Sequence, residues 1–126
     1  MNPLAPLSIL IVEDDPVSSQ LAAHYLKSYG SVIKTSTAAA AVANYMVHRP
    51  GIVFVDIHYK HEEATGFDVL RHLLSADQNA YIVMISADHD PKTIQKALTF
   101  GAQGFISKPF KAEDFTPHLK KHAGNF

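Results

Sequence analysis

Short apolar runs recur along the chain and are separated by longer segments in which apolar residues have helical spacing. The runs are rich in Val, Ile and Leu and do not alternate with polar residues, as is typical of parallel strands that helices cover on both faces. The second run is less apolar, as expected for an edge strand. The pattern predicts strands over residues 8–12, 31–35, 52–55, 81–85 and 104–107.

The segments between these runs carry helix start and stop signals. Asp15 and Pro16 suit an N-cap and a first helical position, and Gly30 is a candidate C-cap. The expected helices cover residues 16–29, 38–48, 67–76, 91–100 and 112–122. The first helix is expected to bury Val17, Leu21, Ala22, Tyr25 and Leu26.

Strands that alternate with helices predict an α/β fold with right-handed crossovers. We expect a doubly wound, flavodoxin-like parallel sheet of five strands in the order 2-1-3-4-5, with helices on both faces. A chain of 126 residues that is 47% hydrophobic suffices for one core. The expected organisation is therefore a single domain over residues 1–126, with its core at about 8–122.

Composition excludes several classes of function. The formal net charge of −1 and the scattered Lys and Arg residues give no basic stripe for direct nucleic-acid binding. The sequence contains no cysteine, which excludes disulfides and thiolate metal sites. No window reaches the roughly 20 apolar residues that span a bilayer, so no membrane contact is expected. The cytoplasm is the default location.

Polar residues follow four of the predicted strands, at the end where each strand is expected to reach the protein surface. Glu13 and Asp14 follow the first strand, Asp56 the third, Ser86 the fourth and Lys108 the fifth. Open α/β sheets bind ligands outside the carboxyl ends of the strands, where the strand order reverses. Strands one and three flank that point, so three carboxylates are expected to face one another. Their repulsion favours a hard divalent cation with oxygen ligands.

Four motifs at the ends of four strands make this chain similar to a known family. They are VEDDP at 12–16, VD at 55–56, ISA at 85–87 and SKPF at 107–110. In this order and spacing the sequence resembles the receiver domain of two-component response regulators, over about residues 8–119. One acidic pair alone would be typical of a solvated turn.

The resemblance implies a role for each acidic residue. Asp56 is expected to be the phosphoacceptor, whose carboxylate attacks the phosphorus of a phosphohistidine and becomes an aspartyl phosphate. Asp14 is expected to bind Mg²⁺ or Mn²⁺ directly and Glu13 through water, joined by Asp56 and the backbone carbonyl of His58. Phosphoryl transfer depends mainly on such positioning and charge neutralisation.

The same resemblance implies roles for residues after the fourth and fifth strands. Ser86 is expected to hydrogen-bond a phosphoryl oxygen, and Lys108 to pair with Asp56 or the phosphoryl group. A cis peptide bond before Pro109 would direct the lysine into the site. Phe105 is the implied switch, moving inward when Ser86 engages the phosphate, although an aromatic on a terminal strand is as often simply core.

The implied function is a phosphoacceptor receiver that takes a phosphoryl group from a sensor histidine kinase or a histidine phosphotransfer protein and then switches a protein-interaction surface. Such a protein is not an enzyme beyond its own phosphorylation and dephosphorylation. The downstream partner is either a target protein or an output domain outside this sequence, with a phosphorylation-dependent dimer also open. A pseudo-receiver that only binds proteins remains an alternative. So does an aspartate-nucleophile phosphatase, although His58 stands where that chemistry wants a second Asp.

The loop over residues 57–65 departs from the family pattern. It is about two residues longer than usual and lacks the common Met-Pro pair. Its His58, His61, Glu62 and Glu63 crowd the expected phosphorylation site. Either the loop is simply solvated, or it alters metal affinity, phosphoryl lifetime or the choice of kinase. A zinc site from His58 and His61 has loose spacing and no cysteine to complete it.

Pro117 is a second departure, because proline inside a helix removes a hydrogen bond and clashes with the preceding turn. The last helix is therefore expected to begin late, to kink or to split near Thr116. That helix contributes to the dimer face of many related regulators, so dimerisation of the usual kind becomes less certain. Asp88 and His58 match positions that tune phosphoryl lifetime in the family.

Overall fold

The computed structural model describes residues 7–60, 63–88 and 90–123. Within these residues strands and helices alternate strictly along the chain. The strands are β1 (Leu7–Val12), β2 (Gly30–Thr35), β3 (Ile52–Asp56), β4 (Ile82–Ser86) and β5 (Gly104–Ser107). The helices are α1 (Pro16–Leu26), α2 (Ala38–His48), α3 (Gly66–Ala76), α4 (Pro91–Thr99) and α5 (Ala112–Ala123).

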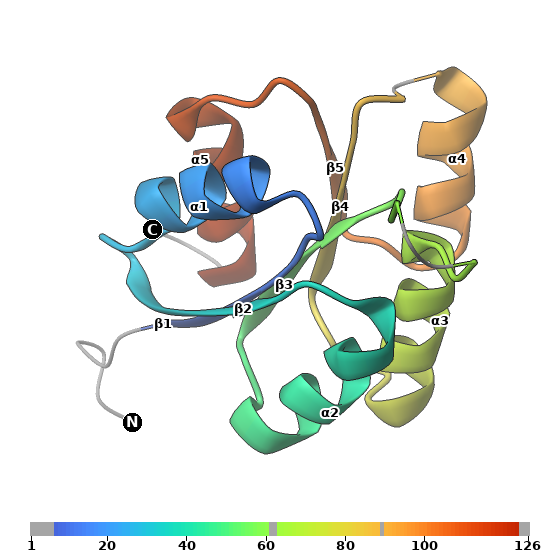
Figure 1. Ribbon diagram of the computed structural model, residues 1–126, viewed down its shortest axis with the longest axis horizontal. Coiled ribbons are helices and arrows are strands. Elements are labelled where there is room, and N and C mark those ends of the chain that lie inside the picture. Colours follow the sequence, from blue (N-terminus) through green and yellow to red (C-terminus); the bar gives the residue numbers. More distant parts are fainter. Residues whose placement is uncertain (1–6, 61–62, 89, 124–126) are drawn as a thin grey trace.

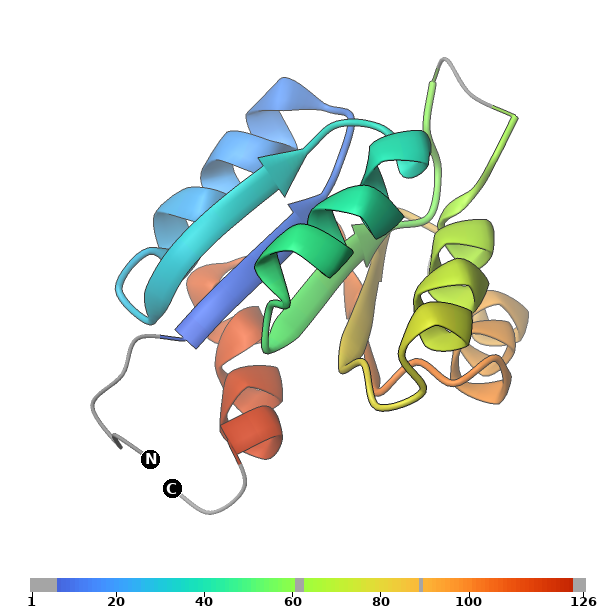
Figure 2. The same cartoon turned by 90° about the horizontal axis from the view of Figure 1, so that it is seen from below.

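The strands form one parallel sheet in the order β2-β1-β3-β4-β5 (Figure 1). The predicted fold class, strand order and helical cover are confirmed. Helices α1 and α5 cover one face, and α2, α3 and α4 cover the other (Figures 1 and 2). The strand order reverses between β1 and β3, so the loops after these two strands meet at one edge of the sheet.

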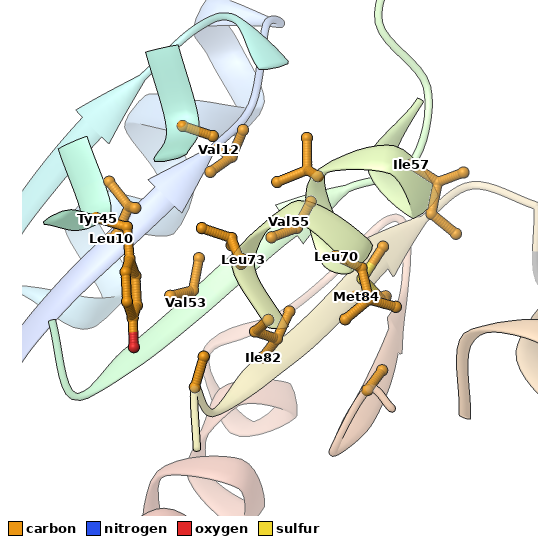
Figure 3. Close-up of a cluster of buried hydrophobic side chains, with 14 of the residues drawn as sticks. Leu10, Val12, Tyr45, Val53, Val55, Ile57, Leu70, Leu73, Ile82 and Met84 are labelled. Carbon is orange, nitrogen blue, oxygen red and sulfur yellow. The ribbon is translucent and has the colours of Figure 1, made fainter. Parts of the chain in front are cut away.

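Both faces of the sheet are buried, which explains why the strands read as continuous apolar runs. Successive residues of a strand point to opposite faces. Leu10 and Val12 thus pack under α2 and α3, whereas Ile9 and Ile11 pack under α1 and α5. Figure 3 shows the first of these clusters, in which Leu70 and Leu73 of α3 lie over the strands.

Helix α1 differs from its prediction. It ends at Leu26 with Lys27 as C-cap, and Gly30 instead opens β2, where a side chain would collide with the backbone carbonyl of Leu7. Val17 is 72% exposed and Leu21 is 38% exposed. The buried residues of the helix are Ser19, Ala22 and Leu26, and Tyr25 is partly buried against the core. The prediction is therefore confirmed for Ala22 and Leu26 and wrong for Val17 and Leu21. The predicted N-cap Asp15 is confirmed.

Helix α5 begins at Ala112 and contains Pro117, so the predicted late start and split are wrong. Phe115 and Leu119 lie one on each side of the proline and are both buried in the core. These two buried side chains hold the helix against the sheet, although Pro117 has no N–H to donate to the preceding turn. The proline itself is exposed. Within the described residues, none of the helices combines the length and the apolar character needed to cross a bilayer.

Candidate functional site

Backbone hydrogen bonds fix the loops that surround the carboxyl ends of the strands. The N–H of Glu13 donates to the carbonyl of Thr35 over 3.0 Å, which sets the turn after β1. The N–H of Lys108 donates to the carbonyl of Ser86 over 2.9 Å, which ties the loop after β5 to the end of β4. The predicted cis peptide bond between Lys108 and Pro109 is confirmed.

The predicted carboxylate cluster is present. Oxygen atoms of Glu13, Asp14 and Asp56 all lie within 4.8 Å of one another. Glu13 and Asp56 are each only 4% exposed, whereas Asp14 is half-buried. An all-oxygen set of this kind, with acids brought together despite their like charge, suits a hard divalent cation.

Lys108 supplies the one ammonium that contacts this cluster among the described residues. Its Nζ lies 2.6 Å from Oε1 of Glu13 and 3.4 Å from Oδ1 of Asp56. The sequence indicated the pairing with Asp56 but not the shorter one with Glu13. No pattern could have ranked the two carboxylates, because their separation from the lysine depends on how the turn after β1 directs the side chain of Glu13.

Burial and mutual contact shift the titration of the cluster. Burial, assisted by the contact with Asp56, raises the pKa of Glu13 to about 7 although Lys108 opposes the shift. Burial likewise raises the pKa of Asp56. Burial acts to lower the pKa of Lys108, but its contacts with Glu13 and Asp56 outweigh this and the pKa is raised. One ammonium does not compensate three carboxylates, so the site as a whole favours a further positive charge.

A cavity of about 370 Å³ opens beside the cluster. It is lined by Asp14, Asp15, Ser18, Asp56, His58, Tyr59, Lys60, Ala87 and Lys108. Ser86 is fully buried and does not line this cavity. Its Oγ instead accepts a hydrogen bond of 3.0 Å from the N–H of Asp88. The Oγ of Ser86 therefore contacts the loop after β4, while its O–H can still donate.

The loop after β3 is anchored rather than wholly solvated. Ile57 is 1% exposed and Tyr59 is 7% exposed, and both belong to the core cluster under α2 and α3. The N–H of Lys60 donates to the carboxylate of Asp14 over 2.6 Å, which joins the loop to the turn after β1. His58 and Lys60 are exposed along the cavity. His61 and Glu62 lie outside the described residues. The hypothesis of a zinc site from His58 and His61 is therefore not tested.

Phe105 lies on β5, half-buried, and packs against the cluster under α2 and α3. It also borders a second cavity, of about 630 Å³, between β5 and the first turns of α5. Phe105 thus lies at the edge of the core, where it borders this cavity. Its role as a switch remains a prediction.

Comparison with known proteins agrees with this geometry. The family model of the response regulator receiver domain matches residues 9–120. The chemotaxis protein CheY of Treponema pallidum is 30% identical over 107 residues, which cover 83% of this chain and 74% of that protein. The nitrogen assimilation regulatory protein NtrX of Azorhizobium caulinodans is 34% identical over 106 residues, or 83% of this chain. That match spans only 23% of NtrX, and matches to several other curated regulators span about half of their length.

Solved structures give the same result. The CheX-CheY-BeF3-Mg²⁺ complex of Borrelia burgdorferi contains a chain that is 27% identical, with a TM-score of 0.85 over 93% of this chain and 89% of that one. The chemotaxis protein CheY4 of Vibrio cholerae is 22% identical with a TM-score of 0.85, covering 93% of this chain and 98% of that one. This chain belongs to the response regulator receiver domain family.

Proposed function

We propose that this chain is a phosphoacceptor receiver of a two-component or phosphorelay system, with Asp56 as the residue that is phosphorylated. The observation that carries the proposal is that Asp56, Glu13, Asp14 and Lys108 converge beside one open cavity at the switch point of the sheet. An aspartate buried in a structural role would need neither the cavity nor the extra acids.

In the proposed reaction, Oδ of Asp56 attacks the phosphorus of a phosphohistidine, a P–O bond forms, and the P–N bond to the imidazole breaks. Lys108 lies close enough to Asp56 to compensate charge on the phosphoryl oxygens. Asp14, Glu13, Asp56 and the carbonyl of His58 would hold Mg²⁺ or Mn²⁺, which when bound would neutralise further phosphoryl charge. The convergence of three carboxylate oxygens supports this metal set.

We infer that the phosphoryl donor is a sensor histidine kinase or a histidine phosphotransfer protein, and that the recipient of the signal is a target protein or an output domain. The family membership supports this inference. The relatives named above include both a chemotaxis protein and a regulator of nitrogen assimilation, so the pathway is not specified by the receiver itself.

Intact-mass spectrometry after incubation with acetyl phosphate and Mg²⁺ tests the proposal. We expect one phosphoryl group to be added to the wild-type protein and none to the Asp56→Asn variant. The Asp68→Asn variant is a matched control, because Asp68 is a half-buried carboxylate of the α3 capping box that does not belong to the acidic cluster. A wild-type protein that stays unmodified would favour the pseudo-receiver instead.

A further inference from the structure

Asp14 is the acid of the carboxylate cluster that burial holds least. Glu13 and Asp56 are each 4% exposed and both contact Lys108. Asp14 is half-buried and lines the open cavity. A side chain beside open solvent can exchange between rotamers unless a specific contact selects one of them. Because Asp14 is the proposed direct ligand of the metal, the contact that fixes its carboxylate bears on metal binding.

That contact comes from the backbone of the loop after β3. The N–H of Lys60 donates to Oδ2 of Asp14 over 2.6 Å. A hydrogen bond from an amide to an ionised carboxylate is roughly twice as strong as one between neutral groups. A carboxylate also offers about four acceptor positions. The bond from Lys60 therefore leaves positions free for a cation and does not have to break when one binds.

The backbone that carries this N–H is itself fixed. Ile57 is 1% exposed and Tyr59 is 7% exposed, and both side chains lie in the core. The N–H of Ile57 donates to the carbonyl of Ile85 over 3.0 Å, and its carbonyl accepts from the N–H of Gly66 over 2.7 Å. The side chain of Lys60 is exposed. The rigid part of Lys60 is thus its N–H, which a proline at this position would lack.

We propose that the backbone N–H of Lys60 positions the metal site: it holds the carboxylate of Asp14 beside Glu13 and Asp56, so that a divalent cation meets a cluster that is already formed. The inference rests on the proposed function and deepens it. Lys60 is a positioning residue, because it acts through Asp14. Hydrogen bonds to ligating carboxylates typically change metal affinity by about 10- to 100-fold. By reciprocity, a bound cation that fixes Asp14 also strengthens the bond from Lys60.

Two substitutions of Lys60 separate its N–H from its side chain. Lys60→Pro removes both the N–H and the ammonium, whereas the matched control Lys60→Ala removes only the ammonium. In calorimetric titrations we expect Lys60→Pro to bind Mg²⁺ about tenfold more weakly than Lys60→Ala. Lys60→Ala should bind Mg²⁺ at least as tightly as wild type, since it loses an exposed positive charge near the cluster. Equal affinities of the two variants would overturn the proposal.

Amide hydrogen exchange of the wild-type protein, followed by NMR, tests the same bond without a substitution. We expect exchange of the Lys60 N–H to slow by about tenfold when Mg²⁺ saturates the protein. The N–H of Ala40 is the internal control, because it donates to the hydroxyl of Thr37 and should not respond.

The outcomes distinguish this inference from the proposed function. A protein that binds Mg²⁺ and is phosphorylated by acetyl phosphate, but whose Lys60 N–H does not respond to Mg²⁺, would overturn this inference alone. A wild-type protein that neither binds Mg²⁺ nor gains a phosphoryl group would overturn the proposed function and this inference with it.

Discussion

The ammonium of Lys108 lies 2.6 Å from the carboxylate of Glu13, closer than to that of the proposed phosphoacceptor. Glu13 is also a proposed metal ligand. The lysine therefore contacts an acid that a bound cation would share. The two positive charges compete for one acidic cluster, so binding of the metal and the position of the lysine are coupled.

Replacing Lys108 by Met should strengthen Mg²⁺ binding by about tenfold, because three carboxylates then lack their one cationic contact. Calorimetric titration with Mg²⁺ measures this change. Phosphorylation by acetyl phosphate should become slower in the same variant, since charge on the phosphoryl group is less well compensated. Lys111→Met, a change of an exposed lysine on the same loop, is the control. Unchanged or weaker Mg²⁺ binding by Lys108→Met would contradict the competition.

Gly66 should tolerate no side chain. A Cβ there would collide with the backbone carbonyl of Asp56 and lie 2.6 Å from the Cα of Ile57. We expect Gly66→Ala to lower the free energy of unfolding by about 3 kcal/mol, as overpacking against fixed backbone does. Gly51→Ala is a useful contrast, because its Cβ would meet the side chains of Leu7 and His122, which can move. Urea denaturation should show a clearly smaller loss for Gly51→Ala, and equal losses would refute this explanation.

Topology and the acidic cluster could be predicted because both depend on local patterns. Apolar runs with β-branched residues specify buried parallel strands, and the end of a strand fixes where Asp56 and its neighbours lie. The cis peptide bond before Pro109 followed from the family resemblance and is present.

The wrong predictions concern relations between elements. Periodicity alone placed Val17 and Leu21 inside, but the buried face of α1 carries Ser19, Ala22 and Leu26 instead. Pro117 stays inside α5 because core residues on both sides outweigh a local cost of roughly 3 kcal/mol. Such balances depend on contacts between distant segments, which a single sequence does not rank.

Two histidines on α5 should make the protein less stable in mildly acidic solution than it would be without them. Glu13 acts in the opposite direction, because its pKa of about 7 lies above that of the unfolded chain. Burial lowers the pKa of both His118 and His122 below the ordinary 6.5. Lys121 lowers the pKa of His118 further, and Asp114 partly offsets this. At these two positions the unfolded chain therefore takes up protons first as the pH falls through 6.5. The contribution of the histidines to the free energy of unfolding decreases until they are also protonated in the folded protein.

Urea denaturation at about pH 7.5 and about pH 5.5 measures the change in the free energy of unfolding. On going to the lower pH this change should favour the folded state more in His118→Gln and His122→Gln than in wild type. His72→Gln is the control, because His72 is exposed on α3. An identical change in wild type and in both α5 variants would show that other groups govern the acid response.

An aromatic and cationic cluster should hold the C-terminal end of α4. The rings of Phe67 and Phe100 meet edge to face at 6.0 Å, and Lys96 lies 4.4 Å from the centre of the Phe67 ring. Arg71 lies 5.9 Å from the centre of the Phe100 ring. Since α4 buries little else, we expect Phe100→Ala to cost about 1.5 kcal/mol and to speed amide exchange in the last turn of the helix. Leu98→Ala, a change of an exposed apolar residue on the same helix, should have a smaller effect on both measurements, and equal effects would argue that the rings do not hold this end of the helix.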